Sequence, residues 1–175
     1  MIRFKGNDIK CFDELYLVAP AAVRQKLDDN KVLKENPLYH PEDNAFEHIK
    51  IVTNRLFETK DINMVLTGFF HDICKAETAI PRENSPYFLC RDHEKHAVAF
   101  ALRHVNFIHS FEDVDLGKIL WIIDNHMRIK QIADMRGYKK TEILENTWFE
   151  SLVAFSKADK MTQEWDFMSP GLFKL

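Results

Sequence analysis

The stretch FFHDICK, at residues 69–75, places a histidine and an aspartate next to each other in an apolar setting. His71 and Asp72 both need water or a polar partner, yet the phenylalanines and the isoleucine around them are typical of a protein core. Burial of an ionised carboxylate is costly unless a partner compensates for it. A bound metal ion would be such a partner, and the positions of the other polar residues in the chain bear on this explanation.

The composition is that of an ordinary soluble globular protein, with 46% hydrophobic and 29% charged residues. A length of 175 residues allows one domain with a substantial core, and we expect a single domain over residues 1–175. The formal net charge of −3 gives no general attraction for nucleic acid, so an anionic ligand would need a local binding site.

The cysteine pattern indicates a reducing compartment. Cys11, Cys74 and Cys90 are odd in number and include no C-x-x-C pair, which argues against a disulfide framework and against a thiolate zinc site. The sequence has neither the features of a secretory leader nor an apolar run of about 18 residues. We therefore expect a cytoplasmic protein with no membrane association.

The spacing of apolar residues is mostly helical, and five glycines are too few for a β protein rich in turns. Asn44 with Glu47, and Thr147 with Glu150, resemble capping boxes that begin helices. The helices predicted from these patterns cover residues 12–28 with a break at Pro20, 44–57, 62–75 capped by Asp61, 92–107, a segment that begins at Asp113 or Asp115 and carries LGKILWIIDNHM, and 149–161. We expect an all-α, single-domain helical bundle of about six or seven helices, with an irregular tail over residues 163–175.

Histidine and aspartate also occur on the apolar faces of other predicted helices. His48 lies beside the apolar stripe of its helix, and His126 falls within the stripe of the helix near residue 120. Asp159 shares the apolar face of the last helix, and His93 begins a helix above apolar residues. With the histidine and aspartate of FFHDICK, these residues give six metal-competent groups that we expect to face a common interior.

Each of these residues alone has a simpler explanation, because a single histidine near an apolar stripe is usually a satisfied interior or boundary residue. Six together are harder to explain in this way, since helical bundles build metal sites from inward-facing imidazoles and carboxylates. Nitrogen and oxygen ligands without thiolate suit manganese, iron, cobalt, nickel or zinc, and they favour magnesium less. The sequence therefore predicts a divalent metal site.

The order His48, then His71 with Asp72, then Asp159 resembles the H…HD…D signature of the HD-domain metal-dependent phosphohydrolase superfamily. The resemblance covers about residues 40–162 and is closest to the HD module of bacterial tRNA nucleotidyltransferases. The segments that carry it are YHPEDNAFEH, HDICKAET, DHEKHAVA and LVAFSKAD. Nothing resembles the nucleotidyltransferase head, so the chain looks like the HD module standing alone.

The resemblance implies an HD-domain fold and a role for each of the six groups. One metal ion would be held by His48, His71, Asp72 and Asp159. A second would be held by His93 and His126, with Asp72 as the bridge. The implied activity is metal-dependent hydrolysis of a nucleotide or related small phosphoester, with a metal-activated water as nucleophile. 2′,3′-cyclic nucleotides and nucleoside monophosphates are the first substrates to test, as for a phosphodiesterase or nucleotidase.

Cationic residues near the six groups are candidates for binding phosphate. Lys75 follows Asp72 by nearly one helical turn, and the superfamily often has lysine there, so these two residues are the candidate catalytic residues. Arg128 and Lys130 lie in a basic run just beyond His126 and are further candidates for substrate binding. The alternative for all three cations is an ordinary solvated position.

Two departures from the family pattern concern Cys74, where glycine is usual, and His96, where a small residue is usual. His40, His104 and His109 are predicted to be structural or surface residues. Two other functions remain open. HD-fold di-iron oxygenases have the same order of ligands and would need iron and dioxygen, whereas a non-catalytic module would bind a nucleotide or an RNA end without turnover.

Overall fold

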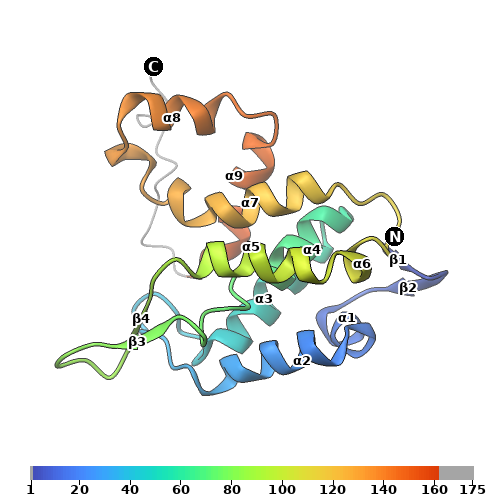
Figure 1. The fold of residues 1–175 in the computed structure, drawn as a ribbon, viewed down its shortest axis with the longest axis horizontal. Helices are drawn as coiled ribbons and strands as arrows, with labels where there is room; N and C mark the ends of the chain where they lie inside the picture. Colours follow the sequence, from blue (N-terminus) through green and yellow to red (C-terminus); the bar gives the residue numbers. More distant parts are fainter. Residues whose placement is uncertain (1, 162–175) are drawn as a thin grey trace.

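The computed structural model describes residues 2–161, which contain nine α-helices and two short β-hairpins (Figure 1). The helices are α1 (Phe12–Val18), α2 (Ala21–Asp28), α3 (Ala45–Phe57), α4 (Ile62–Phe70), α5 (His93–Arg103), α6 (Val105–Ile108), α7 (Leu116–Ile129), α8 (Gly137–Leu144) and α9 (Phe149–Asp159). The antiparallel hairpins are β1 (Ile2–Phe4) with β2 (Asn7–Ile9), and β3 (Ala79–Pro81) with β4 (Phe88–Cys90). The chain is mostly helical, as predicted.

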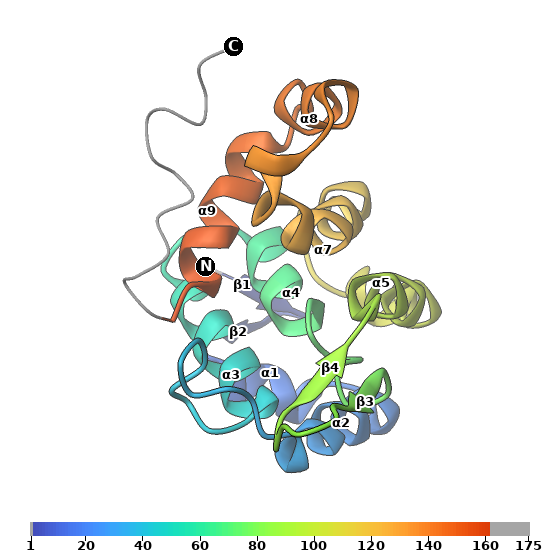
Figure 2. The ribbon, with the colours of Figure 1, turned by 90° about the vertical axis from the view of Figure 1, so that its left-hand side faces the viewer.

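Helix α4 is the centre of the fold, and all nine of its residues are buried. It packs against α3, α5, α7 and α9, which surround it in Figure 1 and Figure 2. Its sequence, INMVLTGFF, has no charged residue and therefore no face that favours solvent. Gly68 lets α3 approach closely, because a Cβ at this position would lie 2.7 Å from Leu56 Cδ1 and 3.2 Å from Thr53 Cα.

Side-chain caps begin three of the helices where the sequence predicts them. Asn44, Asp61 and Asp115 accept backbone hydrogen bonds from the first turns of α3, α4 and α7, respectively. The capping box predicted for Thr147 is wrong, because the N-cap position of α9 is Trp148, which makes no side-chain cap.

Several helix ends differ from the prediction. α4 ends at Phe70 rather than near Lys75, and the chain continues in turns through Thr78. The helix predicted over residues 92–107 is interrupted at His104, which separates α5 from α6. Asp92 precedes α5 but has a left-handed backbone with a φ of 55° and makes no side-chain cap. These ends depend on tertiary packing, which local sequence signals do not describe.

Helix α8 and both hairpins were not predicted. The β1–β2 hairpin turns at Lys5 and Gly6, which both have positive φ (47° and 83°), as a type I′ two-residue hairpin turn requires. The β3–β4 hairpin falls between the helices predicted over residues 62–75 and 92–107.

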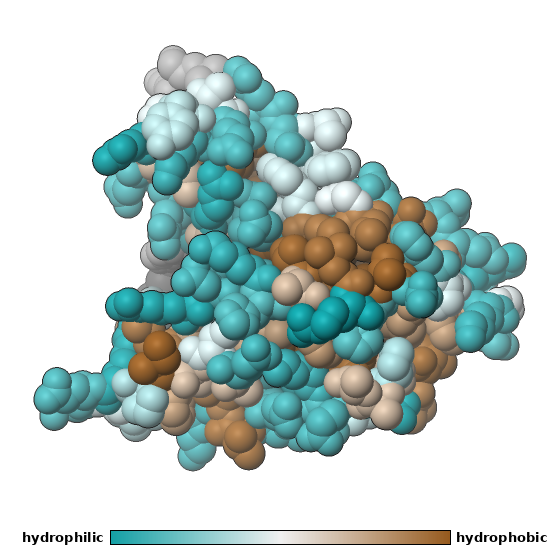
Figure 3. Space-filling view, in the orientation of Figure 1, coloured by the Kyte–Doolittle hydropathy of each residue, from teal (hydrophilic) through white to brown (hydrophobic). Residues whose placement is uncertain are grey.

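The irregular tail predicted over residues 163–175 lies outside the described residues. Residue 162, the last residue of the segment that carries the family resemblance, also lies outside them. Within residues 2–161, no helix combines the length and the apolar character that a membrane span requires. Most of the surface in Figure 3 is hydrophilic, with a hydrophobic area where α5 and α7 lie side by side.

Candidate metal centre

The centre is built where the central helix ends. His71 follows the last residue of α4, so it and Asp72 lie in the first turn beyond the helix, where both are buried. The other four predicted ligands are also buried and come from four different helices: His48 of α3, His93 of α5, His126 of α7 and Asp159 of α9. The structure thus brings all six groups into one interior.

One side of the centre contains His48, His71 and Asp159, whose ligand atoms lie within 4.8 Å of one another. The Oδ1 atom of Asp159 is 2.9 Å from His48 Nε2 and 3.6 Å from His71 Nε2. The Oδ2 atom of Asp72 approaches the same two nitrogens, at 3.6 Å and 3.2 Å, respectively. Two imidazoles and two carboxylates therefore converge here.

The other side contains His93 and His126 together with the second oxygen of Asp72. This oxygen, Oδ1, is 3.0 Å from His93 Nε2 and 3.5 Å from His126 Nε2. The two Nε2 atoms are 3.3 Å apart. Because the two oxygens of Asp72 face different groups of histidines, this carboxylate has the position that a bridging ligand needs.

All four histidines are oriented in the same way by contacts at Nδ1. The Nδ1 atoms of His71, His93 and His126 contact the backbone carbonyl oxygens of Gly68, Cys90 and Ile123, at 2.8, 3.0 and 2.7 Å, respectively. A carbonyl oxygen can only accept, so Nδ1 carries the hydrogen in each ring. His48 Nδ1 lies 2.6 Å from Glu42 Oε1 and is oriented by a carboxylate in the same way. Each Nε2 is therefore the atom left to bind inward, as in metal sites whose outer contacts orient the histidines.

The donor atoms at the centre fit a bound cation. His93 and His126 direct their Nε2 atoms toward each other and toward a carboxylate oxygen of Asp72. Asp72 Oδ1 is buried without a hydrogen-bond partner among the described residues. A buried acceptor without a donor is costly, and a metal ion would satisfy this oxygen together with the neighbouring imidazole nitrogens.

The electrostatics of the metal-free centre favour ionised carboxylates. Burial opposes the ionisation of Asp72, but His71 and Lys75 hold its pKa well below the usual range. Burial likewise opposes the ionisation of Asp159, and Lys130 and His48 hold its pKa well below the usual range. Two buried carboxylates are therefore charged at neutral pH and available as ligands.

Of the three cations predicted to bind substrate, two contact the ligand carboxylates. Lys75 Nζ is 2.8 Å from Asp72 Oδ2, and Lys130 Nζ is 2.7 Å from Asp159 Oδ2. Arg128 instead donates to Asn125 Oδ1 and pairs with Glu142 on α8. Lys75 also lines a cavity beside the centre, whereas Lys130 and Arg128 do not line it.

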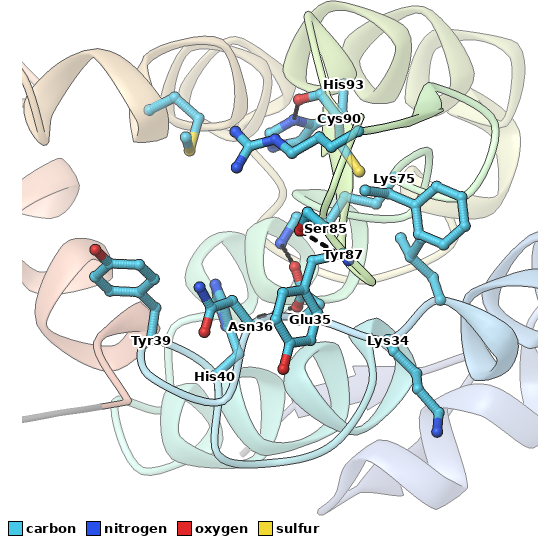
Figure 4. Close-up of a pocket in the computed structure, with 14 residues that line it drawn as sticks. Lys34, Glu35, Asn36, Tyr39, His40, Lys75, Ser85, Tyr87, Cys90 and His93 are labelled. Carbon is cyan, nitrogen blue, oxygen red and sulfur yellow. Dashed lines mark hydrogen bonds and ion pairs between the residues drawn. The ribbon is translucent and has the colours of Figure 1, made fainter.

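A cavity of about 340 Å³ lies against the centre, with Lys75 and His93 in its wall (Figure 4). Its other sides are the segment from Leu33 to His40 and the β3–β4 hairpin with its connecting loop, which contributes Arg82 and Tyr87. The wall combines charged groups next to the centre with aromatic rings and further cations. A small anionic ligand could therefore reach the predicted metal ligands from this side.

Sequence reasoning missed several residues of this region. Glu42 orients His48, and Glu35 Oε1 accepts a hydrogen bond from Lys75 Nζ at 2.6 Å. His40, predicted to be structural or on the surface, lines the cavity and contacts Glu42. The only sequence signal was the closeness of His40 and Glu42 to His48 within YHPEDNAFEH, and Glu35 lies before this segment. Loops bring these residues together in a way that helical periodicity does not reveal.

The two departures from the family pattern lie away from the ligand atoms. Cys74 is fully buried in the hydrophobic core. His96 is exposed on α5, where its Nδ1 is 3.0 Å from Glu77 Oε1. Within residues 2–161, neither side chain forms a hydrogen bond or an ion pair with the six candidate ligands.

Comparison of the chain with protein-family models, with curated proteins and with solved structures gave no match. The geometry of the described residues is therefore the main support for a function.

Proposed function

We propose that the chain is a metal-dependent phosphohydrolase of the HD-domain type that acts on a nucleotide or a related small phosphoester. The observation that carries the proposal is the arrangement of four imidazole Nε2 atoms around two carboxylates, with Asp72 shared between two groups. The H…HD…D resemblance supplies the reaction class. A shared carboxylate between two ligand groups is typical of two-metal hydrolytic sites.

In this proposal the two groups of ligands hold one ion each, and the ions are manganese, iron, cobalt, nickel or zinc. His48, His71 and Asp159 bind on one side of Asp72, and His93 and His126 bind on the other. Bound there, the ions would polarise phosphoryl oxygens and make water a stronger nucleophile near neutral pH.

The protein holds the candidate metal ligands in place and positions a cation, Lys75, beside them. Lys75 is fixed between Asp72 and Glu35 and lines the cavity, so its ammonium can face a phosphoryl oxygen that approaches the centre. Such a preorganised donor stabilises negative charge that develops in the transition state. Lys130 instead positions Asp159. Its ammonium pairs with Oδ2 of this carboxylate, whereas Oδ1 faces the histidines.

The cavity supports a small substrate. Its volume of about 340 Å³ is near the lower end of the usual range for ligand pockets. Lys34 and Arg82 supply further positive charge, and Tyr39 and Tyr87 supply rings on which a base could stack. We propose 2′,3′-cyclic nucleotides and nucleoside monophosphates as the first candidates.

A metal-by-substrate screen tests the proposal. Chelator-treated protein should release no phosphate and open no cyclic ring, and activity should return with Mn²⁺ or Co²⁺. Asp72→Ala should abolish turnover because it removes a ligand from both groups. Asp134→Ala, at an exposed position, is the matched control and should retain full activity.

The outcomes separate the competing functions. Turnover that survives both Asp72→Ala and exhaustive chelation would place the chemistry elsewhere. Oxygen consumption by the iron-loaded protein, without phosphoester cleavage, would favour an oxygenase. Nucleotide binding without turnover at any metal would favour a binding module.

A further inference from the structure

A second cluster of metal-competent groups lies between the cavity and the candidate metal centre. It consists of Glu35, His40 and Glu42, whose ligand atoms lie within 4.8 Å of one another and of His48. His40 Nδ1 is 2.9 Å from Glu42 Oε1 and 3.5 Å from Glu35 Oε2. Figure 4 shows Glu35 and His40 side by side at the cavity. Two carboxylates thus approach one imidazole nitrogen.

Each glutamate of this cluster has one oxygen in a close polar contact and one with no hydrogen-bond partner among the described residues. The Oε1 atom of Glu35 accepts from Lys75, and the Oε1 atom of Glu42 faces the Nδ1 atoms of His40 and His48. Both Oε2 atoms are buried and have no hydrogen-bond partner among the described residues. The two side chains are only 10% and 4% exposed, respectively, so water provides little compensation for this negative charge.

We propose that Glu35, His40 and Glu42 form a third cation site, distinct from the two groups that share Asp72. Two carboxylate oxygens and one imidazole nitrogen suit a divalent ion such as Mn²⁺. Because Glu35 and His40 line the cavity, the ion could exchange with solvent without opening the core. This site goes beyond the proposed hydrolytic function and does not depend on it.

An ion in this site would act on the candidate metal centre through both glutamates. Glu42 orients His48, and Glu35 holds Lys75 beside Asp72. Positive charge at the two Oε2 atoms would weaken the attraction of Glu35 for the Lys75 ammonium and leave this cation more available to an anionic ligand. The third site is therefore placed to regulate the centre as well as to bind metal.

Counting bound Mn²⁺ tests the proposal without any substrate. Chelator-treated protein is titrated with Mn²⁺ alone, and free Mn²⁺ is measured by electron paramagnetic resonance. His40→Lys places an ammonium between the two glutamates but offers no lone pair at neutral pH. We expect this variant to bind one ion fewer per chain than the wild type.

His96→Lys is the matched control, because His96 also faces a glutamate but lies on the surface; it should leave the number of bound ions unchanged. If His40→Lys does not fold, as judged by circular dichroism, Glu35→Gln replaces it. This variant keeps the oxygen that accepts from Lys75, and it should also lose one ion. Equal numbers of bound ions in the wild type and in the folded variant would overturn the proposal. That result would leave the hydrolytic proposal standing, because the count involves no phosphoester.

Discussion

At the scale of single residues, protons and metal compete for His71. In the metal-free centre burial opposes protonation of this ring, but Asp72 and Asp159 raise its pKa to about 9. Burial lowers the pKa of His126 to about 4. At neutral pH the Nε2 atom of His71 is therefore protonated, whereas that of His126 is free to bind.

Metal uptake by the metal-free protein should therefore release protons at neutral pH. Because the pKa of His71 is raised to about 9, the ring keeps its proton below that pH. Metal affinity should therefore increase as the pH rises toward this value and then level off. Isothermal titration calorimetry with Mn²⁺, in buffers of different ionisation enthalpy, measures the released protons. An affinity that does not change between pH 6 and about 9 would contradict the assignment of His71 as a ligand.

Lys75 has a different role from the ligands, and its substitution should separate catalysis from metal binding. Lys75→Ala should retain metal but slow phosphoester hydrolysis by roughly 10²-fold, the effect of losing one preorganised donor. Lys95→Ala, at an exposed position on α5, should leave the rate unchanged. Full activity in Lys75→Ala, measured as initial rates with metal content checked by elemental analysis, would exclude the proposed role.

At the scale of elements, local signals predicted where helices begin better than where they end. Asn44, Asp61 and Asp115 cap their helices as predicted, because a side chain that satisfies free N–H groups acts over a few residues only. The end of α4 at Phe70 was missed. Apolar periodicity continues through FFHDICK, and only tertiary packing shows that the chain leaves the helix there.

The contact between α3 and α4 should be sensitive to one methyl group. Gly68→Ala would place Cβ 2.7 Å from Leu56 Cδ1 and 3.2 Å from backbone of α3. The variant should lose about 1–3 kcal/mol of unfolding free energy, measured by urea denaturation. It should also bind metal more weakly, because the Gly68 carbonyl orients His71.

Gly137→Ala is the matched control for this helix contact. Apart from its chain neighbours, a Cβ at Gly137, the first residue of α8, would meet no atom of residues 2–161 within 4 Å. This variant should be unchanged or more stable by up to about 1 kcal/mol. Equal stability of the two variants would contradict the close approach of α3 and α4.

At the scale of the whole molecule, the sequence predicted a helical domain and the six groups that meet inside it. Polar residues on apolar helix faces are visible in a sequence, so His48, His126 and Asp159 could be identified from periodicity. Glu35 and Glu42 could not, because they reach the site from a loop without periodicity. Their contacts with Lys75 and His48 depend on the path of the chain before α3.

The position of bound metal tests the central proposal most directly. Crystals of the Mn²⁺-loaded protein should give an anomalous difference map with a peak on each side of the Asp72 carboxylate. One peak should lie among His48, His71 and Asp159, and the other beside His93 and His126. A map with no peak next to Asp72, from protein that is saturated with Mn²⁺, would contradict the assignment of these residues as a metal centre.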